Sequence, residues 1–253
     1  MSASLSNLKR LFAFVGAFQC LAGLHAEERC PVEVKLLLPS STTRAVIASL
    51  GFGNETRARV YLFDTDALDL LTQGVIIRVR VGVKSDVTVK VRLPKEEQKI
   101  DNSRSTEQFP CEIDRTRSEA ITSYAVARKY QAIEVPQNGE GIYDLLTASQ
   151  IRLLHEAQVS IDWARVVRIA SIESTKWETT TQSPSGGLTL ELWEWSAGKV
   201  LELSAKVDSA GEMSKLADLE RLLKINDLSL SAIQDTKTNT VLESVADRAS
   251  RPR

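Results

Sequence analysis

The segment at residues 75–94 constrains the fold most, because it contains two pairs of cations and the members of each pair stand two residues apart. It reads VIIRVRVGVKSDVTVKVRLP, and Arg78, Arg80, Lys90 and Arg92 alternate in it with valine and isoleucine. Successive side chains of a β-strand point to opposite faces of the sheet. The segment therefore predicts two strands, each with one apolar and one cationic face. A non-apolar face that is almost purely cationic indicates a surface that holds an anion.

The overall charge argues against a general nucleic-acid or membrane-surface binder. The chain has 253 residues with 32 Lys and Arg against 33 Asp and Glu, a net charge of −1, whereas such binders usually carry a basic excess. The cationic strands must therefore be balanced elsewhere in the chain. With 43% hydrophobic residues, no internal repeat and no low-complexity linker, one domain over residues 27–253 is the simplest expectation.

The first 26 residues are typical of a secretory signal peptide. Lys9 and Arg10 form a short cationic region, an apolar run follows, and the segment ends in the small residue Ala26. We expect residues 1–26 to be cleaved, with the mature protein secreted or periplasmic and without stable membrane insertion. An uncleaved membrane anchor is the alternative, since Leu24 is larger than the residue preferred before a cleavage site.

Two cysteines, Cys30 and Cys111, remain once the signal is removed. In an oxidising compartment a disulfide between them is expected, tying the start of the mature protein to a strand in its middle. Their spacing is not that of a zinc site. One of the two histidines lies within the signal and the other, His155, is expected on a helix surface, so a Ser-His-Asp triad is poorly supported.

Residue patterns along the mature chain predict an alternation of strands and helices. Strands are expected at 30–39, 58–65, 75–83, 87–94, 109–114, 164–181, 188–198 and 199–207, the last two joined by a tight hairpin at Ala197 and Gly198. Helices are expected at 40–53, 67–74, 117–130, 141–157 and 212–226, with a further helix in the tail from Asp235.

Charges that share one face recur on several of these strands, for example Glu33 and Lys35, two residues apart, and Glu202 and Lys206, four residues apart. Such strands can form an open sheet with one solvated face, or a closed barrel with its charges inside and its apolar outer face covered by helices. A solvated face would carry more Thr, Ser and Gln. Mixed carboxylates, arginines and lysines can pair in a polar interior, which favours the barrel.

Several of these segments together resemble the CYTH superfamily, the triphosphate tunnel metalloenzymes. They are EVKLLL, YLFDT, L-x3-G-x3-RVR, VTVKVR and the hairpin GKVLELSAKV followed by a helix, spread from Val32 to about residue 245. The resemblance implies an α+β fold with an antiparallel, eight-stranded closed β-barrel and peripheral helices. It also implies that basic residues bind a triphosphate and that glutamates hold Mg²⁺ or Mn²⁺. Family members hydrolyse tripolyphosphate, thiamine triphosphate or the RNA 5′-triphosphate, and some cyclise ATP.

The carboxylates of the family pattern are only partly present. Its opening signature Glu-x-Glu-x-Lys falls on Pro31, Glu33 and Lys35, and its late Glu-x-Glu falls on Glu202 and Ser204, so one carboxylate is missing from each. The acidic residue before the last hairpin corresponds to Glu191 or Glu194. The expected register places Glu191 opposite Ser204 and Trp193 opposite Glu202, which favours Glu191 but puts a tryptophan inside a hydrophilic tunnel.

The resemblance assigns roles to these positions. Lys35 with Glu33 would be catalytic by orienting a water, and the metal ligands would be Glu33, Glu191 and Glu202. The substrate-binding cations would be Arg78, Arg80, Lys90 and Arg92, with Arg168 or Lys176 supplying later contacts. Glu112 is either an inward carboxylate or an exposed residue, Glu33 and Lys35 could instead form a simple ion pair, and Asp64 is expected to be a structural turn residue.

Two functional hypotheses follow. The first is a secreted, metal-dependent triphosphatase that acts on inorganic tripolyphosphate, polyphosphate or an organic triphosphate. The second is a non-catalytic module that keeps the cationic tunnel and binds a small polyanion, because Lys and Arg alone can bind a triphosphate without hydrolysing it. No nucleic-acid partner is expected under either hypothesis.

Overall fold

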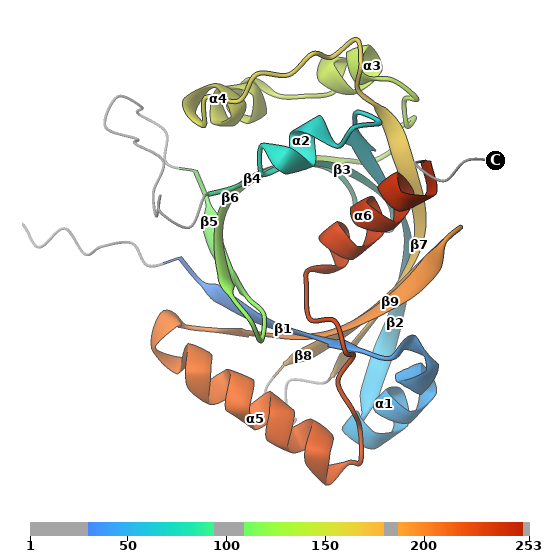
Figure 1. The fold of residues 1–253 in the computed structure, drawn as a ribbon, viewed down its shortest axis with the longest axis vertical. Coiled ribbons are helices and arrows are strands. Elements are labelled where there is room, and N and C mark those ends of the chain that lie inside the picture. Colours follow the sequence, from blue (N-terminus) through green and yellow to red (C-terminus); the bar gives the residue numbers. More distant parts are fainter. Residues whose placement is uncertain (1–29, 94–108, 180–186, 250–253) are drawn as a thin grey trace, which may run out of the picture.

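Nine strands close into one barrel in the computed structural model, which describes residues 30–93, 109–179 and 187–249 (Figure 1). The strands are β1 (Val32–Leu38), β2 (Phe52–Asp64), β3 (Val75–Gly82), β4 (Ser85–Arg92), β5 (Cys111–Arg115), β6 (Ala120–Tyr130), β7 (Val167–Thr179), β8 (Leu188–Trp195) and β9 (Gly198–Val207). Their order around the barrel is β1-β5-β6-β4-β3-β2-β7-β8-β9. The helices are α1 (Thr43–Leu50), α2 (Asp69–Thr72), α3 (Gly139–Asp144), α4 (Ala148–Glu156), α5 (Glu212–Ile225) and α6 (Lys237–Ala249).

The closed α+β barrel confirms the fold prediction in outline and corrects its strand count and direction. Nine strands take part where eight were expected, and β1 pairs with β5 in parallel, while the other neighbours are antiparallel. The segment 117–130, expected to be a helix, contains strand β6, which pairs with both β4 and β5.

The alanines of β6 explain why it resembles a helix in sequence. Ala125 and Ala127 are good helix formers, but in the barrel they lie opposite Lys90 and Thr88 of β4. Cross-strand partners share a face of the sheet, so small residues on β6 leave room inside the barrel for the long side chain of Lys90. Pairing with two neighbouring strands overrides the helix propensity of the segment.

Helices cover the apolar outer face of the barrel, as the alternating pattern predicts. Ile77 and Val89 pack with Leu153 of α4 on one side, and Leu36 packs with Leu219 of α5 on the other. Figure 1 shows α2, α3 and α4 on one side of the ring and α1 and α5 on the opposite side. Because the outward positions of the strands are apolar and covered, their alternate positions, which carry the charges, point into the barrel.

Two local structures position the helices next to β2. Helix α1 ends at Leu50, and its C-cap Gly51 has a φ of 68°, the left-handed conformation that glycine adopts most readily. Asp64 is buried and accepts hydrogen bonds from the backbone N–H groups of Thr65, Leu70 and Leu71 at 2.7 to 2.9 Å. Asp64 is therefore a structural residue that holds the start of α2.

The register of the last hairpin differs from the expected one by a shift of its loop. Trp195 pairs with Gly198, so Ser196 and Ala197 form the loop. Gly198 lies beneath the indole of Trp195 and not in the turn, and a Cβ there would crowd the ring at 3.2 Å. As a result Glu191 lies opposite Glu202, and not opposite Ser204.

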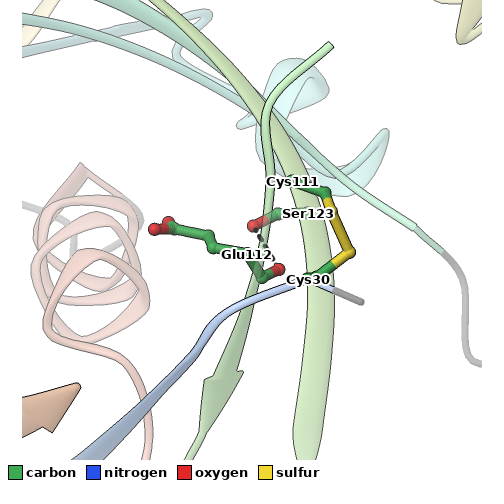
Figure 2. Close-up of a disulfide and its surroundings, with 4 residues drawn as sticks. All are labelled: Cys30, Cys111, Glu112 and Ser123. Carbon is green, nitrogen blue, oxygen red and sulfur yellow. Dashed lines mark hydrogen bonds between the residues drawn. A yellow bond between two sulfur atoms is a disulfide. The ribbon is translucent and has the colours of Figure 1, made fainter. Parts of the chain in front are cut away.

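The expected disulfide joins Cys30 to Cys111 next to the parallel pairing of β1 and β5 (Figure 2). The two Cα atoms are 5.2 Å apart, within the usual range for a bridge. In Figure 2 the side chain of Glu112 points away from the disulfide, as alternation along β5 requires. The predicted signal peptide lies outside the described residues. Among the helices of the described ranges, none has the length and apolar character needed to cross a membrane.

Candidate functional site

A charged cavity of about 690 Å³ occupies the barrel interior. Eight basic side chains line it, namely Lys35, Arg78, Arg80, Lys90, Arg92, Lys176, Lys206 and Lys237. Six acidic side chains also line it, namely Glu33, Glu112, Asp114, Glu178, Glu191 and Glu202. The basic excess of two is local, because the whole chain has a net charge of −1.

The structure brings five of the six predicted substrate-binding cations to this cavity: Arg78, Arg80, Lys90, Arg92 and Lys176. It does not bring Arg168 there. A register shift between β2 and β7 follows Leu62, so that Arg168 pairs with the outward-facing Phe63. Because cross-strand partners share a face, Arg168 lies outside the barrel, where its guanidinium is 5.1 Å from the ring centroid of Tyr61.

A cluster of three carboxylates forms where β1 meets β5. Ligand oxygens of Glu33, Glu112 and Asp114 lie within 4.8 Å of one another. The ammonium of Lys35 lies 2.5 Å from Asp114 and 3.1 Å from Glu33. The ammonium of Lys90 lies 2.5 Å from Glu112 and 2.6 Å from Asp114. Asp114, which is 1% exposed, thus bridges two lysines.

The protonation states in this cluster follow from opposed effects. Burial raises the pKa of Asp114, but the ammonium groups of Lys35 and Lys90 outweigh burial and hold this pKa well below its ordinary value. Burial lowers the pKa of Lys35, but the carboxylates of Asp114, Glu202 and Glu33 outweigh burial. The pKa of Lys35 is therefore raised above its ordinary value. The pKa of Glu33 is likewise lowered, because Lys35 outweighs its burial. Glu33 and Asp114 are therefore ionised, and Lys35 is protonated.

A second ion-paired group lies at the β8–β9 hairpin. Lys237 of α6 lies 2.8 Å from Glu202 and also pairs with Glu191. Glu191 further accepts hydrogen bonds from Ser174 at 2.6 Å and from the Trp193 indole at 2.8 Å. Trp193, expected opposite Glu202, pairs instead with Val200 and is fully buried. The centroid of its ring lies 5.0 Å from the Lys237 ammonium. Trp193 therefore donates a hydrogen bond to Glu191 and forms a cation–π contact with Lys237.

The three cavity arginines keep unused hydrogen-bond donors. Arg78 approaches Asp86 only at 3.7 Å and Arg80 approaches Glu191 only at 3.6 Å, while Arg92 donates to Thr236 at 2.9 Å. The Nε groups of all three arginines are buried and have no hydrogen-bond partner among the described residues. Such a donor costs about 1 to 3 kcal/mol when left unpaired. Burial, followed by repulsion from Arg80, lowers the pKa of Arg78, which is the expected effect of crowded cations.

The comparisons with known proteins concern the barrel as a whole. No protein-family model matches the sequence, and no curated protein matches it either. Among solved structures, a candidate adenylate cyclase from Bacillus halodurans matches with a TM-score of 0.56 at 15% identity, covering 84% of this chain and 97% of that one. The candidate adenylyl cyclase HpAC1 from Hippeastrum, reported to have a dominant triphosphatase activity, matches with a TM-score of 0.53 at 17% identity, covering 84% of this chain and 94% of that one. The chain shares the barrel fold of these two structures, in line with the fold that the resemblance to the CYTH superfamily implies.

This chain departs from the CYTH pattern at Pro31 and Ser204, where the pattern has carboxylates. Ser204, which stands where the pattern has a carboxylate, donates a hydrogen bond of 3.0 Å to Glu33. The other carboxylate is replaced by Pro31, at the edge of β1. Glu112 and Asp114 supply two carboxylates next to β1 from strand β5.

Sequence reasoning missed Asp114 and Lys237. Asp114 stands two residues after Glu112 and so shares its face of the strand, a signal that was available in CEID. Glu112, left open between inward and exposed, lines the cavity. Lys237 carries no comparable signal, because it lies in the polar segment DTKTNT and reaches the barrel only through the packing of α6.

Proposed function

We propose that the cavity binds a linear triphosphate and hydrolyses one of its phosphoanhydride bonds. The substrate is inorganic tripolyphosphate, polyphosphate or an organic triphosphate. One observation carries the proposal: three arginines line one cavity, and the Nε donor of each has no hydrogen-bond partner in the part of the chain that the structure describes. Phosphate oxygens accept such hydrogen bonds, and guanidinium groups match their geometry. These cations come from three strands, Arg78 and Arg80 from β3, Arg92 from β4 and Lys176 from β7, so a linear polyanion would meet them along the cavity.

Lys35 and Glu33 would position the attacking water. Because the pKa of Glu33 is lowered, this carboxylate accepts a hydrogen bond from the water and is too weak a base to remove its proton in the ground state. Protonated Lys35, 3.1 Å from Glu33, would donate to a phosphate oxygen. The water oxygen bonds to phosphorus, the bond to the bridging oxygen breaks, and the water's proton ends on the products, orthophosphate and diphosphate.

The donor chemistry of the Glu33, Glu112 and Asp114 cluster fits a divalent cation. Mg²⁺ and Mn²⁺ prefer oxygen ligands, and the cluster offers three carboxylates close together. When bound there, Mg²⁺ or Mn²⁺ would neutralise charge that develops on the phosphates. Glu191 and Glu202 are less suited than the sequence suggests, because they offer only two carboxylates and share the Lys237 ammonium. We therefore assign the metal to the β1–β5 cluster.

Non-catalytic binding of the polyanion is the second candidate. It is favoured because each of the five inner carboxylates has a lysine partner: Lys35 for Glu33, Lys35 and Lys90 for Asp114, Lys90 for Glu112, and Lys237 for both Glu191 and Glu202. A metal would have to displace these ammonium groups. Under both candidates we propose a secreted or periplasmic location, since the disulfide fits an oxidising compartment.

Phosphate release separates the two candidates. The protein is assayed with tripolyphosphate, ATP and thiamine triphosphate in Mg²⁺, Mn²⁺ or EDTA, beside Arg78→Ala/Arg80→Ala. A matched control is Arg57→Ala/Arg59→Ala, which removes two arginines at the same spacing from exposed positions of β2, where their side chains are 80% and 53% exposed. Metal-dependent release that only the cavity variant loses supports hydrolysis. Binding without release under any condition would leave the second candidate.

A further inference from the structure

One end of the barrel is crossed by residues 231–242, which link α5 to α6 and include the start of α6 (Figure 1). On one wall, the Gln234 side chain accepts from the Leu37 N–H at 3.1 Å and donates to the Leu37 carbonyl at 2.8 Å. Ser118, in the turn between β5 and β6, donates to the Gln234 carbonyl at 3.3 Å. Arg92 of β4 donates to Thr236 and Asn239. The segment is thus attached to β1, to the β5–β6 turn and to β4.

An apolar layer fills the barrel beneath this segment. Val241 and Leu242 of α6 are 0% and 2% exposed and pack in one cluster with inward residues of the strands. The inward residues include Leu37, Leu62, Ile172, Trp193 and Val200. Together with the ion pairs of Lys237, this layer ends the charged cavity at α6.

At the opposite end of the cavity, described residues reach the solvent. Glu178, Gly187 and Lys206 line it there and are exposed, and Lys176 is about one-third exposed. Charged side chains therefore continue to the protein surface at this end, whereas apolar side chains and a helix close the other. A ligand held by Arg78, Arg80 and Arg92 has to arrive from the Lys176 side.

We propose that ligands enter this cavity end first and must carry a free terminal phosphate. This rests on the proposed function and specifies its substrate class. The group that arrives at the closed end meets Arg92 and Lys237, and a terminal phosphate carries more negative charge than an internal one. A chain esterified at both ends would have to bring a bulky organic group to this end. Tripolyphosphate, polyphosphate and triphosphates esterified at one end fit, with the organic group remaining at the mouth.

Binding to the full chain in EDTA, at constant ionic strength, tests this proposal without any hydrolysis. The probes are tripolyphosphate, ATP and diadenosine tetraphosphate. ATP and diadenosine tetraphosphate carry a similar number of negative charges, but only ATP has a free phosphate end. We expect tripolyphosphate and ATP to bind, and ATP to bind at least about tenfold more tightly than diadenosine tetraphosphate by isothermal titration calorimetry.

Equal affinity for ATP and diadenosine tetraphosphate would overturn the end-first proposal and leave the proposed function standing. Cyclic trimetaphosphate, which has no ends, gives a second comparison with linear tripolyphosphate, and equal affinity for these two would count against the proposal in the same way. Absence of binding by all probes, including tripolyphosphate, would overturn the proposed function and this inference together.

Discussion

The ammonium of Lys237 lies 2.8 Å from Oε1 of Glu202, a residue that the sequence predicts as a metal ligand. The same ammonium also pairs with Glu191. Helix α6 is therefore tied to the β8–β9 hairpin by charge as well as by the apolar contacts of Val241 and Leu242. A cation of the chain itself thus pairs with two of the three carboxylates that the family resemblance implies as metal ligands.

Replacing Lys237 by methionine should destabilise the protein strongly. The side chains of Glu191 and Glu202 are 8% and 4% exposed, and without the ammonium they face each other across paired strands. Breaking a buried ion pair by removing one partner costs about 3 to 5 kcal/mol. Urea unfolding measures the loss, with Lys199→Met as control, because Lys199 pairs with Glu194 on the same hairpin but is exposed. A loss equal to that of the control would contradict this role. If Lys237→Met does not fold, adding Glu191→Gln should restore part of its stability.

The pH dependence of stability should report on Glu191. Burial raises the pKa of this carboxyl, and Lys237 and Arg80 together lower it further, so the folded pKa lies below the ordinary value of 4.5. A lowered folded pKa means that this stabilisation is fully present above pH 4.5 and is lost as the pH falls toward the folded pKa. Glu191→Gln should therefore lose less stability than wild type below this pH, by up to about 1.4 kcal/mol per pH unit. Urea unfolding of both proteins at several pH values below 4.5 tests this prediction. If the unfolding free energy falls with the same slope in wild type and Glu191→Gln, the prediction is wrong.

Asp114→Asn should destabilise the protein and strengthen anion binding. Asp114 neutralises Lys35 and Lys90 at 2.5 and 2.6 Å, and its removal leaves two buried ammonium groups short of a partner. We expect a loss of about 3 kcal/mol in unfolding free energy without ligand. The rise in melting temperature caused by tripolyphosphate should become larger than in wild type, and the effect of Mg²⁺ smaller. Asp218→Asn on the surface of α5 is the control, and a smaller tripolyphosphate shift in Asp114→Asn would argue against the proposed cluster.

Loss of the disulfide should destabilise the barrel where β5 joins β1. The bridge spans a sequence separation of 81 residues, and bridges of this kind contribute about 2 to 4 kcal/mol. Cys30→Ser/Cys111→Ser should lower the unfolding free energy by this amount. Reductant should lower that of wild type only. Since β5 carries Glu112 and Asp114, the double variant should also show a weaker Mg²⁺ effect on melting temperature. Unchanged stability would show that the parallel β1–β5 pairing holds without the bridge.

The sequence predicts the inward cations well, because alternation along a strand fixes which side chains share a face. Arg78, Arg80, Lys90 and Arg92 all reach the cavity for this reason. The same reasoning placed Arg168 wrongly, because a register shift between β2 and β7 turns its side chain outward. Such shifts leave no clear trace in the sequence.

Long-range contacts are what the sequence could not supply. Alanine-rich β6 reads as a helix until its pairing with β4 and β5 is known. The position of a hairpin loop sets which residues face each other, so moving it by one residue pairs Glu191 with Glu202. The contribution of Lys237 depends on where a terminal helix packs, which no local pattern determines.

Calorimetric titration of tripolyphosphate in EDTA tests the central claim most directly, that the inward arginines form a polyanion site. Two charge-assisted contacts are lost in Arg78→Ala/Arg80→Ala, each worth about 1.5 kcal/mol or more, so its affinity should fall at least about 100-fold below that of wild type. Arg57→Ala/Arg59→Ala should bind like wild type, because its arginines lie on the exposed face of β2. If the cavity variant binds tripolyphosphate as tightly as the control variant, the barrel interior is not the site.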